Sequence, residues 1–137
     1  MSNESVYTSA SWDRLDDYPL DPLPDDHPWP ARENLTLRDY FVPLSCNHLA
    51  FSIGRLAPGQ SVEHHRHKEA EEVYLLLRGS GQIRINDDVI DAQPLDAFRI
   101  PPHAFRSVYN NSTDECWWLF MGAPVTEFLE HREAASD

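Results

Sequence analysis

Short apolar segments recur along the chain between residues 37 and 121, and Gly, Pro, Asn and Asp residues stand between them. Short runs bounded by such turn residues are typical of β-strands. We expect strands at Leu37–Val42, His48–Leu56, Ser61–His67, Glu71–Arg78, Gln82–Ile85, Val89–Asp91, Asp96–Ile100, Phe105–Tyr109 and Glu115–Met121. Many short strands with regular turns predict an all-β fold, either a closed barrel or two packed sheets.

Alternation along the fourth of these segments indicates which side chains share a face. If Glu72 points into the barrel, Tyr74 and Leu76 point there too, because the side-chain period of a strand is two. The residues between and after them face outward: Val73, Leu75 and Leu77. Segment 117–120 is apolar on both faces as well. We expect the N-terminal arm, a C-terminal helix or a second subunit to cover this surface, and we predict a homodimer.

The sequence divides into three parts. Residues 1–34 are rich in Pro and Asp, and proline excludes a sheet interior or a long helix. This part also contains Trp12 and Trp29, so we expect an extended arm that packs on the domain or on a partner; the alternative is a disordered leader. We assign the barrel to residues 35–123 and a short helix with a tail to residues 124–137.

Composition narrows the class of protein. With 137 residues, the chain is long enough for a single domain. Its formal net charge of -12 would repel nucleic acid. No apolar stretch approaches membrane-spanning length, and the start of the chain does not resemble a signal peptide. Cys46 and Cys116 form neither a zinc pattern nor a disulfide framework. We therefore expect a protein of the reducing cytoplasm.

The candidate chemistry lies between Gly59 and Gly79. His65 and His67 are two residues apart, so in a strand both imidazoles lie on one face. A short polar interval then turns the chain back, and we expect Glu72 on the neighbouring strand, facing the imidazoles. Two histidines and one carboxylate form the facial triad of non-haem iron sites, which leaves positions for substrate or oxygen. The alternative is a solvated, His-rich turn.

At these residues the chain resembles the cupin superfamily. The first cupin motif is a glycine, five residues, His-x-His, three or four residues, Glu, six residues and a glycine. Gly59, His65, His67, Glu72 and Gly79 fill every fixed place. The resemblance implies a jelly-roll barrel, also called a double-stranded β-helix, with a divalent metal held by His65, His67 and Glu72.

The second cupin motif is degenerate. It runs glycine, five residues, Pro-x-Gly, two residues, His, three residues and Asn, and only Pro101 and Asn110 keep their places. Leu95 and His103 stand where the glycines belong, and Arg106 stands where the fourth ligand belongs. Arginine has no lone pair to donate, so Arg106 is not a ligand.

Three arrangements follow from this departure. In the first, three ligands hold the ion and Arg106 pairs with a substrate carboxylate. In the second, the turn that contains His103 is remodelled and His103 becomes the fourth ligand. In the third, the metal site is lost and Arg106 forms a buried salt bridge with Glu72.

The first arrangement gives the leading functional hypothesis. A small-ligand site needs a few convergent polar groups, and we take Arg106 and Tyr74 as candidate catalytic residues beside the ion. We expect a metal-dependent enzyme of an oxygenase or Lewis-acid type that acts on a small, anionic organic acid. Fe(II) is the first choice, with Ni, Mn or Zn as alternatives. The competing functions are a non-catalytic binding or sensing module and a non-redox lyase or isomerase.

Overall fold

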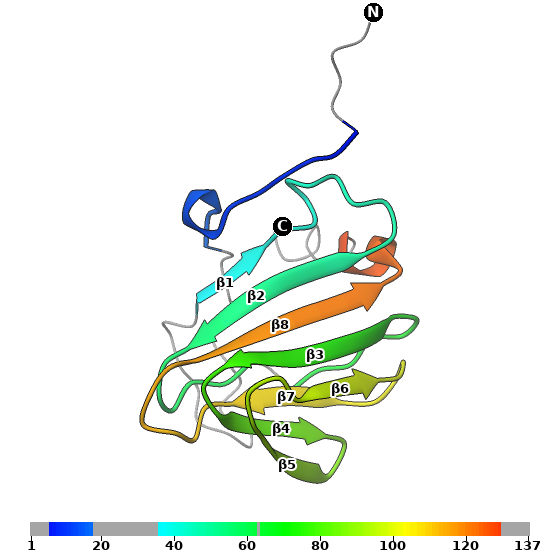
Figure 1. The fold of residues 1–137 in the computed structure, drawn as a ribbon. Helices are drawn as coiled ribbons and strands as arrows, with labels where there is room; N and C mark the ends of the chain where they lie inside the picture. The colour runs from blue at the N-terminus through cyan, green and yellow to red at the C-terminus, as the bar shows by residue number, and fades with distance from the viewer. Residues whose placement is uncertain (1–5, 18–35, 63, 130–137) are drawn as a thin grey trace, which may run out of the picture.

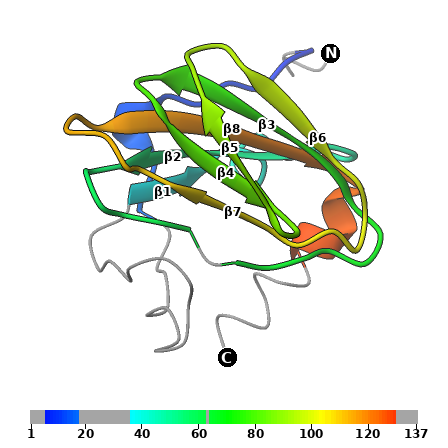
Figure 2. The same ribbon diagram turned by 90° about the horizontal axis from the view of Figure 1, so that it is seen from below.

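The computed structural model describes residues 6–17, 36–62 and 64–129 of the chain. Two antiparallel sheets pack face to face, as the predicted jelly roll requires (Figures 1 and 2). The five-stranded sheet has the order β1 (Thr36–Asp39), β2 (Ala50–Leu56), β8 (Cys116–Ala123), β3 (Glu71–Arg78) and β6 (Ala97–Ile100). The three-stranded sheet has the order β5 (Asp88–Ala92), β4 (Gly81–Ile85) and β7 (Arg106–Tyr109).

Burial alternates along the central strands of the larger sheet. In β3 the side chains of Glu72, Tyr74 and Leu76 are buried, and those between them are half-buried. The predicted inward face of this strand is therefore confirmed. The buried residues of β3, β8 and the smaller sheet form one core between the two sheets: Leu56, Tyr74, Leu76, Ile83, Ala92, Ile100, Ala104, Val108, Cys116, Trp118 and Phe120.

One predicted strand is not continuous. Among its described residues, 61–62 and 64–67, this segment makes only two isolated bridges, Ser61 with Tyr109 and His65 with Arg106, so it runs antiparallel to β7 as an irregular edge of the smaller sheet. Glu72 lies on β3, which pairs with β6 and β8 in the other sheet. The expectation that Glu72 would lie on a strand neighbouring the histidines is therefore wrong. The interval 68–70 carries the chain from one sheet to the other.

The described part of the predicted arm packs on the barrel. Residues 6–17 include the 3-10 helix η1 (Trp12–Arg14), and the ring of Trp12 lies 4.9 Å from that of Trp117 on β8. The Arg38 guanidinium lies over the Trp12 ring at 4.4 Å, so this contact anchors the arm to β1 as well. The proline-rich part of the prediction, residues 18–35, lies outside the described residues.

A second, smaller core closes one end of the barrel. Residues 125–129 are helical, directly after β8 (Figure 1). Val125 and Phe128 of this helix are buried together with Phe41, Ala50 and Ala70. The rest of the predicted helix and tail, residues 130–137, lies outside the described residues. Within the described ranges, no helix is long and apolar enough to cross a membrane.

Candidate metal centre

Three side chains from both sheets converge at the end of the barrel that the helix closes. His65 and His67 come from the irregular edge beside β7, and Glu72 comes from the start of β3. His65 is fixed by a pair of backbone hydrogen bonds with Arg106: His65 N–H donates to the Arg106 carbonyl at 3.0 Å, and Arg106 N–H donates back at 2.8 Å. This pairing places both imidazoles at one site, with ring centroids 5.1 Å apart.

The donor set fits a divalent transition metal. One ligand atom from each of His65, His67 and Glu72 lies within 4.8 Å of the other two. Donor atoms on one face of an ion, each about 2.0–2.2 Å from it, lie about 3–3.5 Å apart, so side-chain adjustments of about 1–2 Å would close the group. Two imidazoles and a carboxylate suit iron, nickel, manganese or zinc. His67 and Glu72 are buried and His65 is half-buried, so the group is most accessible from the His65 side.

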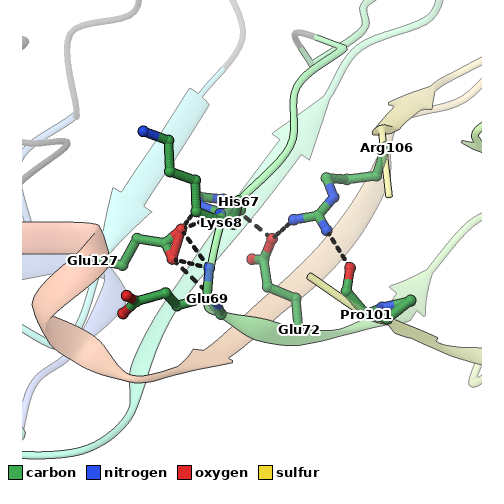
Figure 3. Close-up of polar contacts among 8 residues, drawn as sticks. His67, Lys68, Glu69, Glu72, Pro101, Arg106 and Glu127 are labelled. Atoms are coloured by element: carbon green, nitrogen blue, oxygen red, sulfur yellow. Dashed lines mark hydrogen bonds and ion pairs between the residues drawn. The ribbon is translucent and has the colours of Figure 1, made fainter. Parts of the chain in front are cut away.

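Arg106 lies beside this group as a buried cation. Its Nη1 donates to Glu72 Oε1 at 2.6 Å and its Nη2 donates to the Pro101 carbonyl at 3.2 Å (Figure 3). The side chain is 0% exposed and Glu72 is 4% exposed, so this is the buried ion pair of the third predicted arrangement. The same geometry also keeps the three-residue group together. The Arg106 Nε atom is buried with no hydrogen-bond partner among the described residues, so one donor is left for an acceptor.

Tyr74 joins the network from the interior. Burial raises the pKa of the Tyr74 phenol well above its ordinary value, and Glu72 raises it further through its charge and through a side-chain hydrogen bond. The phenol therefore stays protonated and is a hydrogen-bond donor rather than a base. Its ring packs edge-on against Phe120, with centroids 4.5 Å apart, which fixes its direction.

The structure does not bring His103 to the group. Its side chain is exposed, and in the described part of the chain the group that could hold an ion contains His65, His67 and Glu72 alone. The backbone of His103 has a φ of 72° and its N–H donates to the His67 carbonyl at 2.7 Å. Leu95 also has a positive φ, 73°. Both places that the second motif assigns to glycine thus have the left-handed backbone that glycine favours, although the side chains differ.

Glu127 is a residue that the sequence analysis missed. It comes from the C-terminal helix, and its carboxylate lies against the turn that joins His67 to β3 (Figure 3). Burial opposes the ionisation of Glu127, but three backbone N–H donors and His67 outweigh it, so the pKa of Glu127 lies below its ordinary value. No spacing rule would have indicated this contact, because Glu127 stands 57 residues from Ala70 in the sequence.

Solved structures share this fold. A cupin protein from Bacteroides fragilis is 26% identical, with a TM-score of 0.61, and the alignment covers 72% of this chain and 85% of that one. A putative sugar phosphate isomerase from Acidithiobacillus ferrooxidans is 23% identical, with a TM-score of 0.61, over 66% of this chain and 59% of that one. A predicted oxalate decarboxylase from Thermotoga maritima is 20% identical, with a TM-score of 0.59, over 65% of this chain and 79% of that one.

Sequence comparison identifies the family. No curated protein matches the chain. The family model described as Cupin domain matches residues 52–122, which is more than half of the chain. Together with the two-sheet jelly roll, this match means that the chain belongs to the cupin family.

Proposed function

We propose that this protein is a metal-dependent cupin enzyme that acts on a small organic acid. His65, His67 and Glu72 are the metal ligands in this proposal, and Arg106 binds the acid. The observation that carries it is the convergence of three ligand atoms within 4.8 Å, with the Arg106 guanidinium in contact with one of them.

Each buried side chain has a separate task. A bound divalent ion would supply a Lewis acid or an oxygen-activating centre. The Arg106 Nε–H has no hydrogen-bond partner among the described residues, so it is a donor for an anionic oxygen of the acid. Tyr74 keeps its proton and donates to Glu72, which holds the carboxylate in one orientation. Since the Arg106 guanidinium is shielded from water, solvent screens its attraction for a bound acid less than it would at the surface.

The substrate class rests on Arg106. A planar guanidinium suits a carboxylate. Arg106 is buried and paired with Glu72, so a bound divalent ion would add positive charge to the site, and the carboxylate of the acid would offset that charge. Two of the similar structures are described by activities on small anions, a sugar phosphate and oxalate, but at 23% and 20% identity they support the fold alone. Oxygenase and Lewis-acid chemistry are the two reaction types we propose, with Fe(II) as the metal and Ni, Mn or Zn as alternatives.

The Arg106–Glu72 ion pair favours a second candidate. At 2.6 Å it already supplies Glu72 with a cation, as an ion would. In that case the protein is a metal-independent cupin that binds a small acid without catalysis. The two candidates differ in whether a metal binds, which is directly measurable.

Metal content and oxygen uptake test the proposal. We expect untagged protein loaded anaerobically with Fe(II) to retain one ion per chain, and His65→Ala and Glu72→Ala to lose it. His48→Ala is the matched control, because His48 is exposed and apart from the group. His103→Ala should also retain the ion, since three ligands suffice. The loaded protein should consume oxygen with members of a panel of small carboxylates and phenols, or convert one without oxygen; a wild-type protein that binds no metal would contradict the proposal.

Two features of the whole protein belong to the same proposal. We propose a homodimer, because most outward side chains in the middle of β2, β3 and β8 are apolar and only half-buried in one chain. We also propose a reducing compartment, the cytoplasm, since Cys46 and Cys116 are both free thiols.

A further inference from the structure

The Glu127 carboxylate is held by the turn that follows the second histidine. Its Oε1 accepts a hydrogen bond from Lys68 N–H at 2.6 Å, and its Oε2 accepts from Glu69 N–H at 3.1 Å and from Ala70 N–H at 2.9 Å (Figure 3). Three successive backbone donors around one carboxylate form an anion-binding nest. Glu127 therefore has a fixed position, unlike a carboxylate that extends into water.

The fixed carboxylate faces one nitrogen of His67. The His67 Nδ1 atom lies 3.5 Å from Glu127 Oε1, and its Nε2 atom lies 3.3 Å from Glu72 Oε1. The imidazole thus stands between two carboxylates, one of which belongs to the proposed ligand group. Glu127 shares its Oε1 between His67 and Lys68 N–H, so the turn and the ring are oriented by the same atom.

Phe128 restricts the same ring from the side. Its ring centroid lies 4.7 Å from that of His67, and the ring is buried in the smaller core. The approach is possible because residue 122 is glycine: a Cβ there would lie 2.6 Å from Phe128 Cζ. Consecutive residues of the helix, Glu127 and Phe128, therefore fix the position of His67 by charge and by packing.

We propose that Glu127 is a positioning residue for the metal site. By accepting a hydrogen bond from Nδ1–H of His67, it selects the tautomer in which the Nε2 lone pair is directed at the ion. Histidine ligands commonly donate their second ring N–H to a carboxylate, which fixes the tautomer and raises ligand basicity. This inference rests on the proposed metal-binding function. It assigns to the C-terminal helix a role in the site that no cupin motif residue of this chain supplies.

A purely structural role is the competing explanation. Glu127 caps the turn at residues 68–70, and its loss would loosen the turn whether or not His67 binds a metal. The two roles differ at the imidazole. A structural cap changes stability alone, whereas a positioning residue changes which nitrogen of His67 carries the proton.

The test combines zinc affinity with the tautomer of His67. Zn(II) is a suitable probe because imidazole and carboxylate bind it and it is diamagnetic. We compare the wild type, Glu127→Gln and Glu127→Ala with the control Glu69→Gln, which removes an exposed carboxylate from the same turn. Nitrogen NMR of 15N-histidine-labelled, metal-free protein, at a pH where the imidazole is neutral, reports the tautomer. Thermal unfolding of each metal-free variant shows whether it folds.

We expect wild-type His67 to carry its proton on Nδ1. In Glu127→Ala the proton should move to Nε2, where Glu72 accepts it, and the Zn(II) dissociation constant should rise by about 10–100-fold. Glu127→Gln should fall between the two, since its amide oxygen still accepts a hydrogen bond. Glu69→Gln should match the wild type in both measurements.

Other outcomes overturn the inference in identifiable ways. A folded Glu127→Ala variant with an unchanged tautomer, or with wild-type Zn(II) affinity, would leave Glu127 as a turn cap alone. An equal loss of Zn(II) affinity in Glu69→Gln would mean that the affinity depends on the net negative charge near the site and not on the contact between Glu127 and His67. A wild-type protein that binds no Zn(II) would instead contradict the metal-binding function, while the tautomer measurement still decides whether Glu127 orients His67.

Discussion

Arg106 determines how the candidate site balances its charges. Its pair with Glu72 is almost fully buried, and removing one member of such a pair costs about 3–5 kcal/mol because the other charge is left uncompensated. We expect Arg106→Leu to lower the stability of the metal-free protein by about that amount. A divalent ion should then restore stability more in the variant than in the wild type, because it replaces the lost cation. Thermal unfolding with and without metal measures both effects.

The chain offers a matched control for this prediction. Arg99 and Glu71 form an exposed ion pair of the same length, 2.6 Å, and such pairs contribute less than about 1 kcal/mol. Arg99→Leu should therefore change little with or without metal. If Arg106→Leu no longer binds metal at all, Arg106 holds Glu72 in place instead of binding the substrate. If no ion restores the variant and the wild type binds none either, the metal-independent candidate is correct.

Leu95 carries backbone strain that glycine would relieve. Its φ is 73° and its side chain is 72% exposed, so the left-handed conformation is compensated by little packing. That conformation costs a residue with a Cβ about 1–2 kcal/mol. Glycine avoids this cost, but it makes the unfolded chain more flexible, which lowers the free energy of unfolding by about 0.4–1 kcal/mol. We expect Leu95→Gly to stabilise the protein by about 0.5–1 kcal/mol, measured by denaturant unfolding. Leu95→Ala keeps the Cβ and should give no such gain; an equal gain from alanine would attribute the effect to the exposed leucine side chain.

At the scale of elements, Gly122 couples strand β8 to the metal site and to the helix. A Cβ at this position would lie 2.6 Å from Phe128 Cζ and 2.9 Å from Glu72 Cγ, both closer than real Cβ contacts. We expect Gly122→Ala to displace the ring and the carboxylate together, with a loss of about 1–3 kcal/mol and weaker metal binding. Calorimetric unfolding and metal titration measure the two losses. If Gly122→Ala is as stable as the wild type and binds metal with the same affinity, the helix can shift away from β8 without a loss of stability.

Local patterns were enough to predict most strands. The predicted strand Glu71–Arg78 has the observed bounds of β3, and its alternation correctly gave the inward face with Glu72 and Tyr74. The turn at Asn86, with a φ of 52°, also lies between two predicted strands. These features depend on neighbours in the sequence, which is why a period of two and the turn residues reveal them.

Features that depend on distant contacts were not predictable in the same way. Segment 61–67 has a strand-like sequence, but its described residues make only two bridges, both to β7, whereas Glu72 lies on β3 in the other sheet. The spacing of the first motif predicted that the three candidate ligands lie close together in space, and they do. The predicted pairing of the histidine segment with the Glu72 strand was wrong. Glu127 was missed because its partners are backbone N–H groups, which have no signature in the sequence.

For the whole molecule, the outward surface of the larger sheet indicates how two chains would associate. Strand register places Ile53, Leu119 and Leu75 in one row across β2, β8 and β3, all half-buried. Such a contiguous apolar face favours binding to a second chain. We therefore expect a homodimer in solution, with twice the 15.8 kDa mass of a single chain. Leu119→Lys should produce monomers in light scattering or sedimentation, because each interface would bury two unpaired charges. Val89→Lys places the same charge on an exposed position of the smaller sheet and should leave the dimer intact, whereas a wild-type monomer would mean that this face needs no second chain.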